Sequence, residues 1–421
     1  MRGNSATDLR GQQIFGILDI GTSKVAAAVV ATDPTDRNTP AKIIGLGLQR
    51  SKGVKAGVLT DLDEAEMAVR AAISQAERSA NVTLESVSVS VSCGRLKSAH
   101  FSASADIHSG VVTDDDISRM LAGGRAYAER DGRTLLHMNQ LGYRLDGAEG
   151  VRDPKGLAAR HLLAHLHTVT ADEAPLRNLL LLIERCYLTC DGLVATPYAS
   201  ALAATTEEER DIGITCIDLG AGTSSISMFA DGRFIGADVV PVGSQHITFD
   251  IAKALQTPLV EAERIKTLYG TLVSAQSDEH ESFSYPLAGE DDGTSYQTTK
   301  ARLTDIIRPR VAQILGLVRE RLAQNGASAY AGDRVVLTGG ASQLLGSQEF
   351  TANQLGKPVR AGRPQSFPGL PESLSGPQFA ALAGLAIAAG QSESQFGAYR
   401  DRAASAQGYF GRVGSWLKAG F

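Results

Sequence analysis

Hydrophobic and polar positions repeat one pattern at two places far apart in the chain. Residues 14–30 and 212–229 each read as an apolar strand, an Asp–x–Gly turn with small hydroxylated residues, and a second apolar strand. This pattern predicts a β-hairpin with a polar, glycine-rich tip. Because the same hairpin occurs twice, we expect two lobes built on one plan.

Strands and helices alternate behind both hairpins. Apolar residues recur at helical spacing in five segments: 61–80, 172–190, 244–255, 258–269 and 302–324. Thr60 or Asp61 is expected to cap the first of these helices. Residues 43–49 and 335–340 read as strands. Such alternation is typical of α/β lobes with mixed sheets.

One long segment, residues 84–168, breaks this alternation. It begins with SVSVSVS at 86–92, whose period of two predicts a strand. An acidic helix start follows at 113–116, and further strands are expected near 134–145 and 161–170. The segment therefore predicts an α+β insertion of about 80 residues, the size of a small domain.

Polar segments separate or follow the regular elements. Residues 272–297 are rich in Gly, Ser and Asp and predict exposed hairpins or loops. The apolar run Phe379–Ala389 is too short to span a bilayer and contains Gly384. Residues 391–408 are small and polar, as in a flexible linker, and a distinct tail follows.

Composition narrows the class of protein. The chain has 421 residues, of which 43% are hydrophobic and 21% charged, as in ordinary soluble globular proteins. Its formal net charge of −5 gives no global electrostatic reason to expect a nucleic-acid partner. The N-terminus is polar and lacks the apolar core of a signal peptide, so a cytosolic protein is expected unless something holds it to a membrane.

Cysteine and histidine give no metal site. The four cysteines are too few for a secreted disulfide scaffold and indicate a reducing compartment. Cys186 and Cys190 stand four apart in the predicted helix 172–190, where they would share a face as inert residues. The insertion contains a histidine cluster whose strand-like spacing favours a solvated or packed face, so no ligand is assigned: His137, His161, His165 and His167.

Both Asp–x–Gly turns combine groups that a nucleotide phosphate needs. Glycine lets backbone N–H groups converge on an anion, and hydroxyls and one lysine add further donors. A carboxylate before each turn would repel phosphate unless hydrated Mg²⁺ lay between them, held through water by Asp19 and Asp218. The candidate phosphate residues are Asp19, Gly21, Thr22, Ser23, Lys24, Asp218, Gly220, Ala221, Gly222 and Thr223.

A third glycine turn and one helical pair complete the candidate site. Gly339, Gly340 and Ala341 follow a predicted strand and would let a ring or sugar approach the backbone. Glu263 and Lys266 lie one helical turn apart and could hydrogen-bond ribose hydroxyls, although such a pair is equally common on a surface. Together the segments predict ATP with Mg²⁺ bound between two lobes.

Three segments, DIGTSK, DLGAGTSS and LTGGAS, resemble the phosphate-one, phosphate-two and adenosine motifs of the actin, hexokinase and heat-shock chaperone superfamily. Within it the chain resembles the bacterial cell-division FtsA family, over about residues 14–390 and again at the tail. EAERIKTLYG (261–270) and IIRPR (306–310) add to this resemblance. It implies an α/β, actin-like two-lobed fold of duplicated ribonuclease-H-like lobes, with an inserted α+β subdomain IC and a C-terminal amphipathic helix.

The resemblance also implies how the chain is divided. The implied parts are lobe IA (12–83, 169–197 and 361–390), subdomain IC (84–168), lobe IIA (198–243 and 301–360), lobe IIB (244–300), the linker (391–408) and a membrane-targeting helix (409–421).

A function follows from the same resemblance. The protein would bind ATP, polymerise, and anchor the ring of the tubulin-like FtsZ to the inner membrane through the FtsZ C-terminal tail. It would be peripheral, on the cytoplasmic face at the division septum, and would recruit later division proteins through subdomain IC. Arg302, Arg308 and Arg310 lie in the region that would adjoin the FtsZ-tail site.

One departure concerns catalysis. Actin-like ATPases position the attacking water with a Gln or Glu on the connection after lobe IA. The matching segment here, 194–199, includes Thr196 and Pro197 but carries no carboxylate or amide side chain. Because a missing water-orienting group costs a factor of roughly 10²–10⁴ in rate, we expect at most a weak ATPase. ATP would then serve as a structural and switching ligand.

The tail has an amphipathic pattern. On a helical wheel at about 100° per residue, six apolar residues fall within a sector about 140° wide: Tyr409, Phe410, Val413, Trp416, Leu417 and Phe421. Arg412 and Lys418 fall outside it, where anionic headgroups would favour them. The pattern is typical of a helix lying in a membrane interface. The alternative, a helix docked onto its own lobe, fits the preceding polar linker less well.

Two other functions use the same superfamily fold. A sugar-kinase-like phosphotransferase would need a catalytic carboxylate facing the substrate hydroxyl, and no candidate stands near the second turn or the connection. A pilus-assembly ATP-binding protein would share the core but would explain the tail less well.

Overall fold

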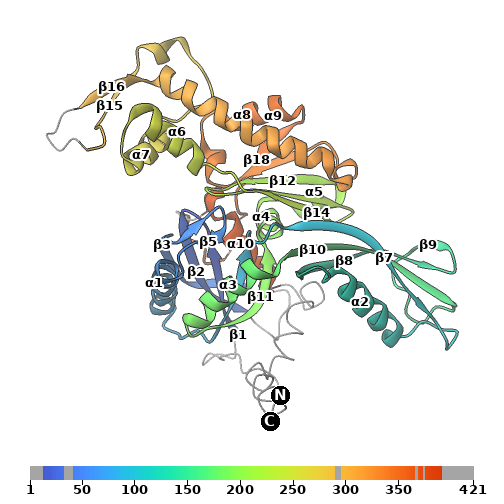
Figure 1. Ribbon diagram of the computed structural model, residues 1–421. Coiled ribbons are helices and arrows are strands. Elements are labelled where there is room, and N and C mark those ends of the chain that lie inside the picture. Colours follow the sequence, from blue (N-terminus) through green and yellow to red (C-terminus); the bar gives the residue numbers. More distant parts are fainter. Residues whose placement is uncertain (1–12, 33–40, 290–294, 366–367, 373–374, 391–421) are drawn as a thin grey trace.

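The two predicted hairpins form the centres of two five-stranded sheets in the computed structural model (Figure 1). The structure describes residues 13–32, 41–289, 295–365, 368–372 and 375–390. The predicted linker and membrane-targeting helix, 391–421, lie outside the described residues.

Both sheets have the same topology. The first contains, in spatial order, β11 (Thr189–Ala195), β6 (Ser86–Val91), β1 (Gln13–Ile20), β2 (Lys24–Thr32) and β3 (Lys42–Arg50). The second contains β18 (Val359–Ala361), β17 (Val335–Thr338), β12 (Ile214–Leu219), β13 (Ser224–Ala230) and β14 (Arg233–Val240). In each sheet three successive antiparallel strands are extended by two parallel ones. The expectation of two lobes built on one plan is therefore confirmed.

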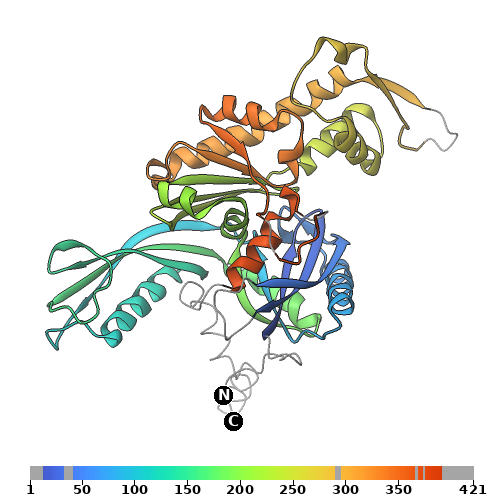
Figure 2. The same ribbon diagram turned by 180° about the vertical axis from the view of Figure 1, so that it is seen from behind.

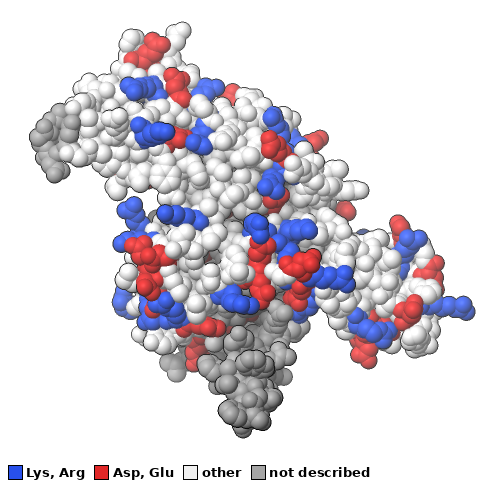
Figure 3. Space-filling view, viewed as in Figure 1, with Lys and Arg blue, Asp and Glu red and all other residues white. Residues whose placement is uncertain are grey.

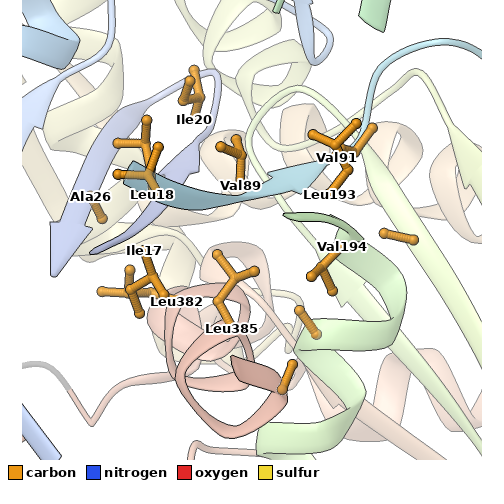
Figure 4. Packing of buried hydrophobic residues seen from close by; sticks show 14 of the residues in the cluster. Ile17, Leu18, Ile20, Ala26, Val89, Val91, Leu193, Val194, Leu382 and Leu385 are labelled. Atoms are coloured by element: carbon orange, nitrogen blue, oxygen red, sulfur yellow. The ribbon is translucent and has the colours of Figure 1, made fainter. Parts of the chain in front are cut away.

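Helices cover the first sheet on both faces. On one side, α1 (Leu62–Ala80) packs on β2 and β3, and α3 (Glu173–Arg185) packs beside it. Asp61 caps α1, because its Oδ1 accepts the N–H of Glu64 at 3.0 Å. On the other side lies α10 (Ala380–Gly390), whose Leu382 and Leu385 pack below Ile17 of β1 (Figure 4).

A helix pair lies where the two lobes meet. α4 (Thr196–Ala204) packs against α10 on one side and against β12 and β13 of the second sheet on the other (Figures 1 and 2). Because α4 directly follows β11, its first residue stands at the junction of the lobes. The connection 194–199 therefore lies between the two lobes.

The second lobe has two parts with separate cores. Near the sheet lie α5 (Glu207–Ile212), α9 (Ser347–Leu355) and the C-terminal half of α8 (Lys300–Gln324). Further out lie α6 (Gln245–Leu255), α7 (Leu259–Tyr269), the other half of α8 and a hairpin of β15 (Ser282–Tyr285) and β16 (Tyr296–Thr299). The predicted helices and the hairpin are thus confirmed, although Phe283 and Tyr285 of the hairpin are buried in the outer core.

The insertion forms its own four-stranded sheet at the side of the molecule (Figure 1). Its strands are, in spatial order, β7 (Lys97–Asp106), β10 (His161–Asp172), β8 (Arg133–Leu145) and β9 (Ala148–Val151). α2 (Asp114–Ala128) packs on the sheet and begins with a capping box of Thr113 and Asp116. The predicted helix start and the two later strands are confirmed.

The insertion begins later than the predicted boundary at residue 84. β6, which was expected to open it, instead pairs in parallel with β1 and β11 of the first sheet. Its alternate residues Val87, Val89 and Val91 are buried in the core of the first lobe. Because this core absorbs the period-two pattern, the inserted sheet starts only at Lys97.

The predicted helix over 172–190 is too long. It ends at Arg185, and Tyr187 then adopts a left-handed backbone with φ 62°. Cys190 already lies in β11, which pairs with β6, whereas Cys186 ends the helix. The two cysteines therefore do not share a helical face, because strand pairing takes over where the apolar spacing still resembled a helix.

Candidate functional site

A cavity of about 710 Å³ lies between the two lobes and is lined by every residue predicted for the nucleotide site. The residues come from the two hairpin turns, from α7 and from the turn after β17. They are Asp19, Gly21, Thr22, Ser23, Lys24, Asp218, Gly220, Ala221, Gly222, Thr223, Glu263, Lys266, Gly339, Gly340 and Ala341. The structure thus assembles in one place segments that are far apart in the chain.

The two Asp–x–Gly turns have the same local geometry. The N–H of Gly21 donates to the carbonyl of Lys24 at 3.0 Å, and that of Gly220 donates to Thr223 at 3.0 Å. The turns also approach each other closely, since a Cβ on Gly222 would lie 2.1 Å from Oγ1 of Thr22. Only glycine fits at this approach, which places backbone groups of both lobes around the same space.

A carboxylate stands at the base of each turn. Asp19 Oδ1 accepts a hydrogen bond from Ser90 Oγ at 2.5 Å, and Asp218 Oδ2 accepts one from Ser200 Oγ at 2.5 Å. Burial, together with the nearby charge of Asp19, raises the pKa of Asp218 to about 6. A cation beside these carboxylates would offset the cost of burying the charge of Asp218, and hydrated Mg²⁺ suits carboxylates held in this way.

The two serines were missed by the sequence analysis. Ser90 lies in the period-two strand β6, and its place beside Asp19 follows from the pairing of β6 with β1. Ser200 lies on α4, which reaches Asp218 from the other side of the junction. Neither position carries a motif, so only the sheet order brings them to the carboxylates.

Lys24 is held at the edge of the first turn. Its Nζ donates to the carbonyl of Gln378 at 2.6 Å and lies 4.9 Å from the ring centre of Phe379. Its charge also opposes the rise in the pKa of Asp218. The lysine thus joins the first turn to the segment before α10 and keeps a positive charge next to the carboxylates.

On the α7 side, Lys266 orients Glu263. The buried Lys266 Nζ donates to Glu263 Oε2 at 2.7 Å and to Thr248 Oγ1 at 2.9 Å, while Thr248 donates to Glu263 Oε2 at 2.5 Å. Burial lowers the pKa of Lys266. Since the Glu263 side chain is 54% exposed, its carboxylate is the member of this set with access to a ligand.

The turn after β17 closes the cavity near Asp218. Gly339 has φ +87°, and a Cβ there would lie 2.2 Å from Oδ1 of Asp218. A side chain would therefore displace the carboxylate as well as strain the backbone. Apolar Phe249, Leu259 and Val260 line the cavity too, and sequence reasoning had not singled them out.

The connection between the lobes reaches the cavity at Thr196. Its Oγ1 is buried and has no hydrogen-bond partner among the described residues. The segment 194–199 brings neither a carboxylate nor an amide to the site. Amide side chains reach the cavity from elsewhere, at Gln245, Gln343 and Gln378.

The three predicted basic residues lie on α8, away from the lining of this cavity. Arg302 is exposed, and Arg308 donates to Ser274 Oγ at 3.0 Å. Arg310 makes two hydrogen bonds to Asp250, at 2.5 and 2.8 Å. On the face in Figure 3, Lys and Arg are interspersed with Asp and Glu.

The histidines of the insertion have different surroundings. His161 and His165 are exposed, whereas His137 and His167 are buried. Among the described residues no group of three or more His, Cys, Asp or Glu could hold a metal ion. No helix among all the described residues combines the length and apolar character needed to cross a membrane.

Sequence comparisons identify the family. The chain matches the family model "Cell division protein FtsA" over residues 215–384 and "SHS2 domain inserted in FTSA" over residues 93–170. It is 39% identical to the cell division protein FtsA of Agrobacterium fabrum, covering 97% of this chain and 95% of that relative. The chain belongs to the FtsA family. It is also 32% identical to FtsA of Neisseria meningitidis and 30% identical to FtsA of Escherichia coli, over 97% and 95% of this chain.

Solved structures agree on the fold of this FtsA-family chain. A PilM–PilN type IV pilus biogenesis complex matches with a TM-score of 0.64 at 17% identity, covering 90% of this chain and 99% of that chain. MreB5 of Spiroplasma citri bound to ADP matches with 0.53 at 15% identity, covering 89% and 95%. The protein is thus a cell division protein with an actin-like, two-lobed α/β fold and an SHS2 insertion. The likeness to PilM concerns the fold alone, whereas the sequence relatives place the chain with FtsA.

Proposed function

We propose that this protein binds ATP with Mg²⁺ in the cavity between its lobes. The observation that carries the proposal is the meeting of two equivalent glycine turns, each with a carboxylate at its base, around one space. Gly21–Lys24 and Gly220–Thr223 would hold the phosphates, and Asp19 and Asp218 would hold Mg²⁺ through water. Glu263, oriented by Lys266, would meet the ribose. MreB5, a fold relative, was solved with ADP and with AMPPNP.

Calorimetric titration with ATP tests this site. We expect binding in Mg²⁺ that weakens in EDTA, and loss of binding in Gly222→Val, because a side chain there would collide with Thr22. Gly123→Ala, at a helical glycine in the insertion with open space around it, is the matched control and should bind as the unchanged protein does. Equal affinity in Gly222→Val and in the control would disprove the site.

Bound ATP would be hydrolysed only slowly. Thr196 is the polar side chain that the connection brings to the cavity, and a hydroxyl orients water less strongly than a carboxylate or an amide. We therefore propose a weak ATPase whose ligand stabilises one arrangement of the lobes. Rapid phosphate release from the purified protein in a steady-state assay would contradict this.

The cell-division role extends to partners. As an FtsA-family member, the protein would polymerise on the cytoplasmic face of the inner membrane and connect the FtsZ ring to it at the septum. The FtsZ C-terminal tail would bind the outer part of the second lobe, near Arg302 and Arg308, whereas Arg310 is engaged with Asp250. Later division proteins would bind the insertion, and residues 409–421 would anchor the filament to anionic lipid.

A pull-down with the FtsZ C-terminal peptide tests the adaptor role. The double charge reversal Arg302→Glu and Arg308→Glu should weaken binding by about tenfold or more. Arg319→Glu is the control, because Arg319 is an exposed residue toward the other end of α8. If the unchanged protein binds ATP but not the peptide, the adaptor role is wrong. If the double variant binds the peptide as well as the unchanged protein does, the tail binds elsewhere.

A further inference from the structure

The insertion is attached to both lobes at one buried place. Its strands β7, β8 and β10 pack against β14 of the second lobe, and β8 also packs against β11 of the first. Rings from the insertion, from α4 and from the second sheet gather there, with centres 4.9 to 6.0 Å apart: His137, His167, Tyr198, Phe229 and Phe234. This contact is separate from the nucleotide cavity and has no role in the function proposed above.

His167 ties the insertion to the second lobe. It is fully buried, and its Nδ1 lies 2.8 Å from the carbonyl of Phe234. Because a carbonyl only accepts, Nδ1 carries the proton and Nε2 accepts from Ser98 Oγ at 2.7 Å. Ser98 Oγ in turn accepts the N–H of Ala237 at 3.2 Å. Two strands of the insertion are thus hydrogen-bonded to β14 at two points.

His137 ties the insertion to the connection between the lobes. Its buried Nε2 accepts the N–H of Ala195 at 2.9 Å, and its ring packs against Tyr198 and Phe234. Ala195 directly precedes Thr196, which lines the nucleotide cavity. A side chain of the insertion therefore holds the backbone one residue away from the cavity.

We propose that His137 and His167 are positioning residues that couple the nucleotide cavity to the orientation of the insertion. One histidine holds the insertion to Ala195 at the end of β11, and the other holds it to β14. A change in the angle between the lobes must then move the insertion or break a buried hydrogen bond. The inference rests on the proposed nucleotide site and adds the route by which a bound nucleotide alters the surface that the insertion presents.

Hydrogen exchange with and without Mg²⁺–ATP tests this coupling in the full chain. The reporters are peptides that contain the amides of Ala195 and Ala237, and a peptide over the second phosphate turn reports binding itself. His137→Phe keeps a ring but removes the acceptor, whereas His137→Gln places an amide oxygen near the lost nitrogen. Ser98→Ala removes one of the two hydrogen bonds to β14, the one from Ala237, and leaves that of His167 to Phe234 in place.

The chain offers a matched control for the contact of Ser98 and His167 with β14. Ser102 and His165 form the equivalent Ser–His bond, at 3.0 Å, between the same strands β7 and β10. His165 is exposed, and the bond joins two strands of the insertion to each other. Ser102→Ala and His165→Phe therefore remove a hydroxyl or an imidazole without touching either lobe.

In the unchanged protein, ATP should slow exchange at the phosphate turn and alter it at both reporters. In His137→Phe and Ser98→Ala the phosphate turn should still respond, while the response at Ala237 falls about fivefold or more. His137→Gln and both controls should retain it. Response at the turn without any at the reporters, or equal loss in the controls, overturns the coupling. No response at the turn overturns the nucleotide site and this inference with it.

Discussion

Asp19 and Asp218 show how single residues set function against stability. Each carboxylate is buried beside the other's charge and is steadied by one serine hydroxyl, Ser90 or Ser200. Without a cation, the raised pKa of Asp218 means that its ionised form is destabilised in the fold by roughly 2–3 kcal/mol. A protein that keeps such a buried charge for function is less stable than the same fold would be without the charge.

Asp218→Asn should therefore stabilise the nucleotide-free protein while weakening Mg²⁺-dependent ATP binding. An amide still accepts from Ser200 but carries no charge that burial would penalise. We expect the free energy of unfolding at pH 7.5 to rise by about 1–2 kcal/mol in urea titrations without nucleotide. Unchanged ATP affinity in Mg²⁺ would contradict the role of this carboxylate, and lower stability would contradict the electrostatic argument.

The buried histidines make stability depend on acid. Burial lowers the pKa of His137 and of His167 from 6.5 to about 3. The unfolded chain therefore binds protons first, so each histidine lowers the free energy of unfolding by up to about 1.4 kcal/mol per pH unit as pH falls from 6.5 toward 3. Asp218 acts oppositely below about pH 6, because its folded-state pKa is raised.

His137→Gln should flatten this acid dependence. The variant lacks one of the two buried histidines that destabilise the fold in acid, and it retains the carboxylate of Asp218. Its unfolding free energy should therefore fall less steeply between pH 6.5 and 4. Urea titrations at half-unit steps of pH, without nucleotide, measure the two slopes. Parallel slopes for the variant and the unchanged protein would show that His137 takes up its proton at an ordinary pKa in the fold.

At the scale of elements, the crossing of α4 and α10 carries the junction between the lobes. The sequence AALAGLAIAAG of α10 supplies small residues, and at Gly384 the helices touch through backbone. A Cβ on Gly384 would lie 1.7 Å from the carbonyl oxygen of Ala199. The close crossing places Ser200 against Asp218 and Thr196 against the cavity.

Gly384→Ala should destabilise the protein although alanine favours helices. The added methyl forces two packed helices apart, which costs about 1–3 kcal/mol. Gly316→Ala on α8, where a Cβ would meet nothing within 4 Å, is the control and should stabilise by about 0.5–1 kcal/mol. Thermal unfolding of both variants checks the contrast, and equal shifts would mean that the crossing tolerates separation.

At the scale of the whole molecule, membrane attachment and assembly depend on each other in the proposed function. A short amphipathic segment with three glycines, Gly411, Gly414 and Gly420, should bind lipid only weakly. A filament presents many such segments, so their binding adds up by avidity.

Truncation after Gln407 should abolish sedimentation with anionic liposomes and leave ATP affinity unchanged. The removed segment contains Trp416, the single tryptophan of the chain, and the cations Arg412 and Lys418. Lys418→Glu in the full chain is a milder variant that should weaken sedimentation more at low salt than at high salt. If the truncated protein still sediments with the liposomes, the tail is not the anchor.

Local chemistry was readable from the chain in several places. The duplicated hairpins, the helix cap at Asp61 and the acidic helix start at 113–116 each rest on interactions within a few residues. Every predicted nucleotide-site residue reached the same cavity, because glycine turns after strands meet at the junction when two lobes share one topology. The family resemblance was equally accessible and is confirmed by the sequence relatives.

Other features depended on which strands pair and which helices cross. The period-two pattern of β6 marked it as a strand but did not say which sheet would bury it. The serines beside the carboxylates and the attachment of the insertion through His137 and His167 join residues far apart in the chain. Sequence alone determined the turns, since their geometry is local. Only the tertiary structure decided their partners, because burial and pairing are properties of distant segments brought together.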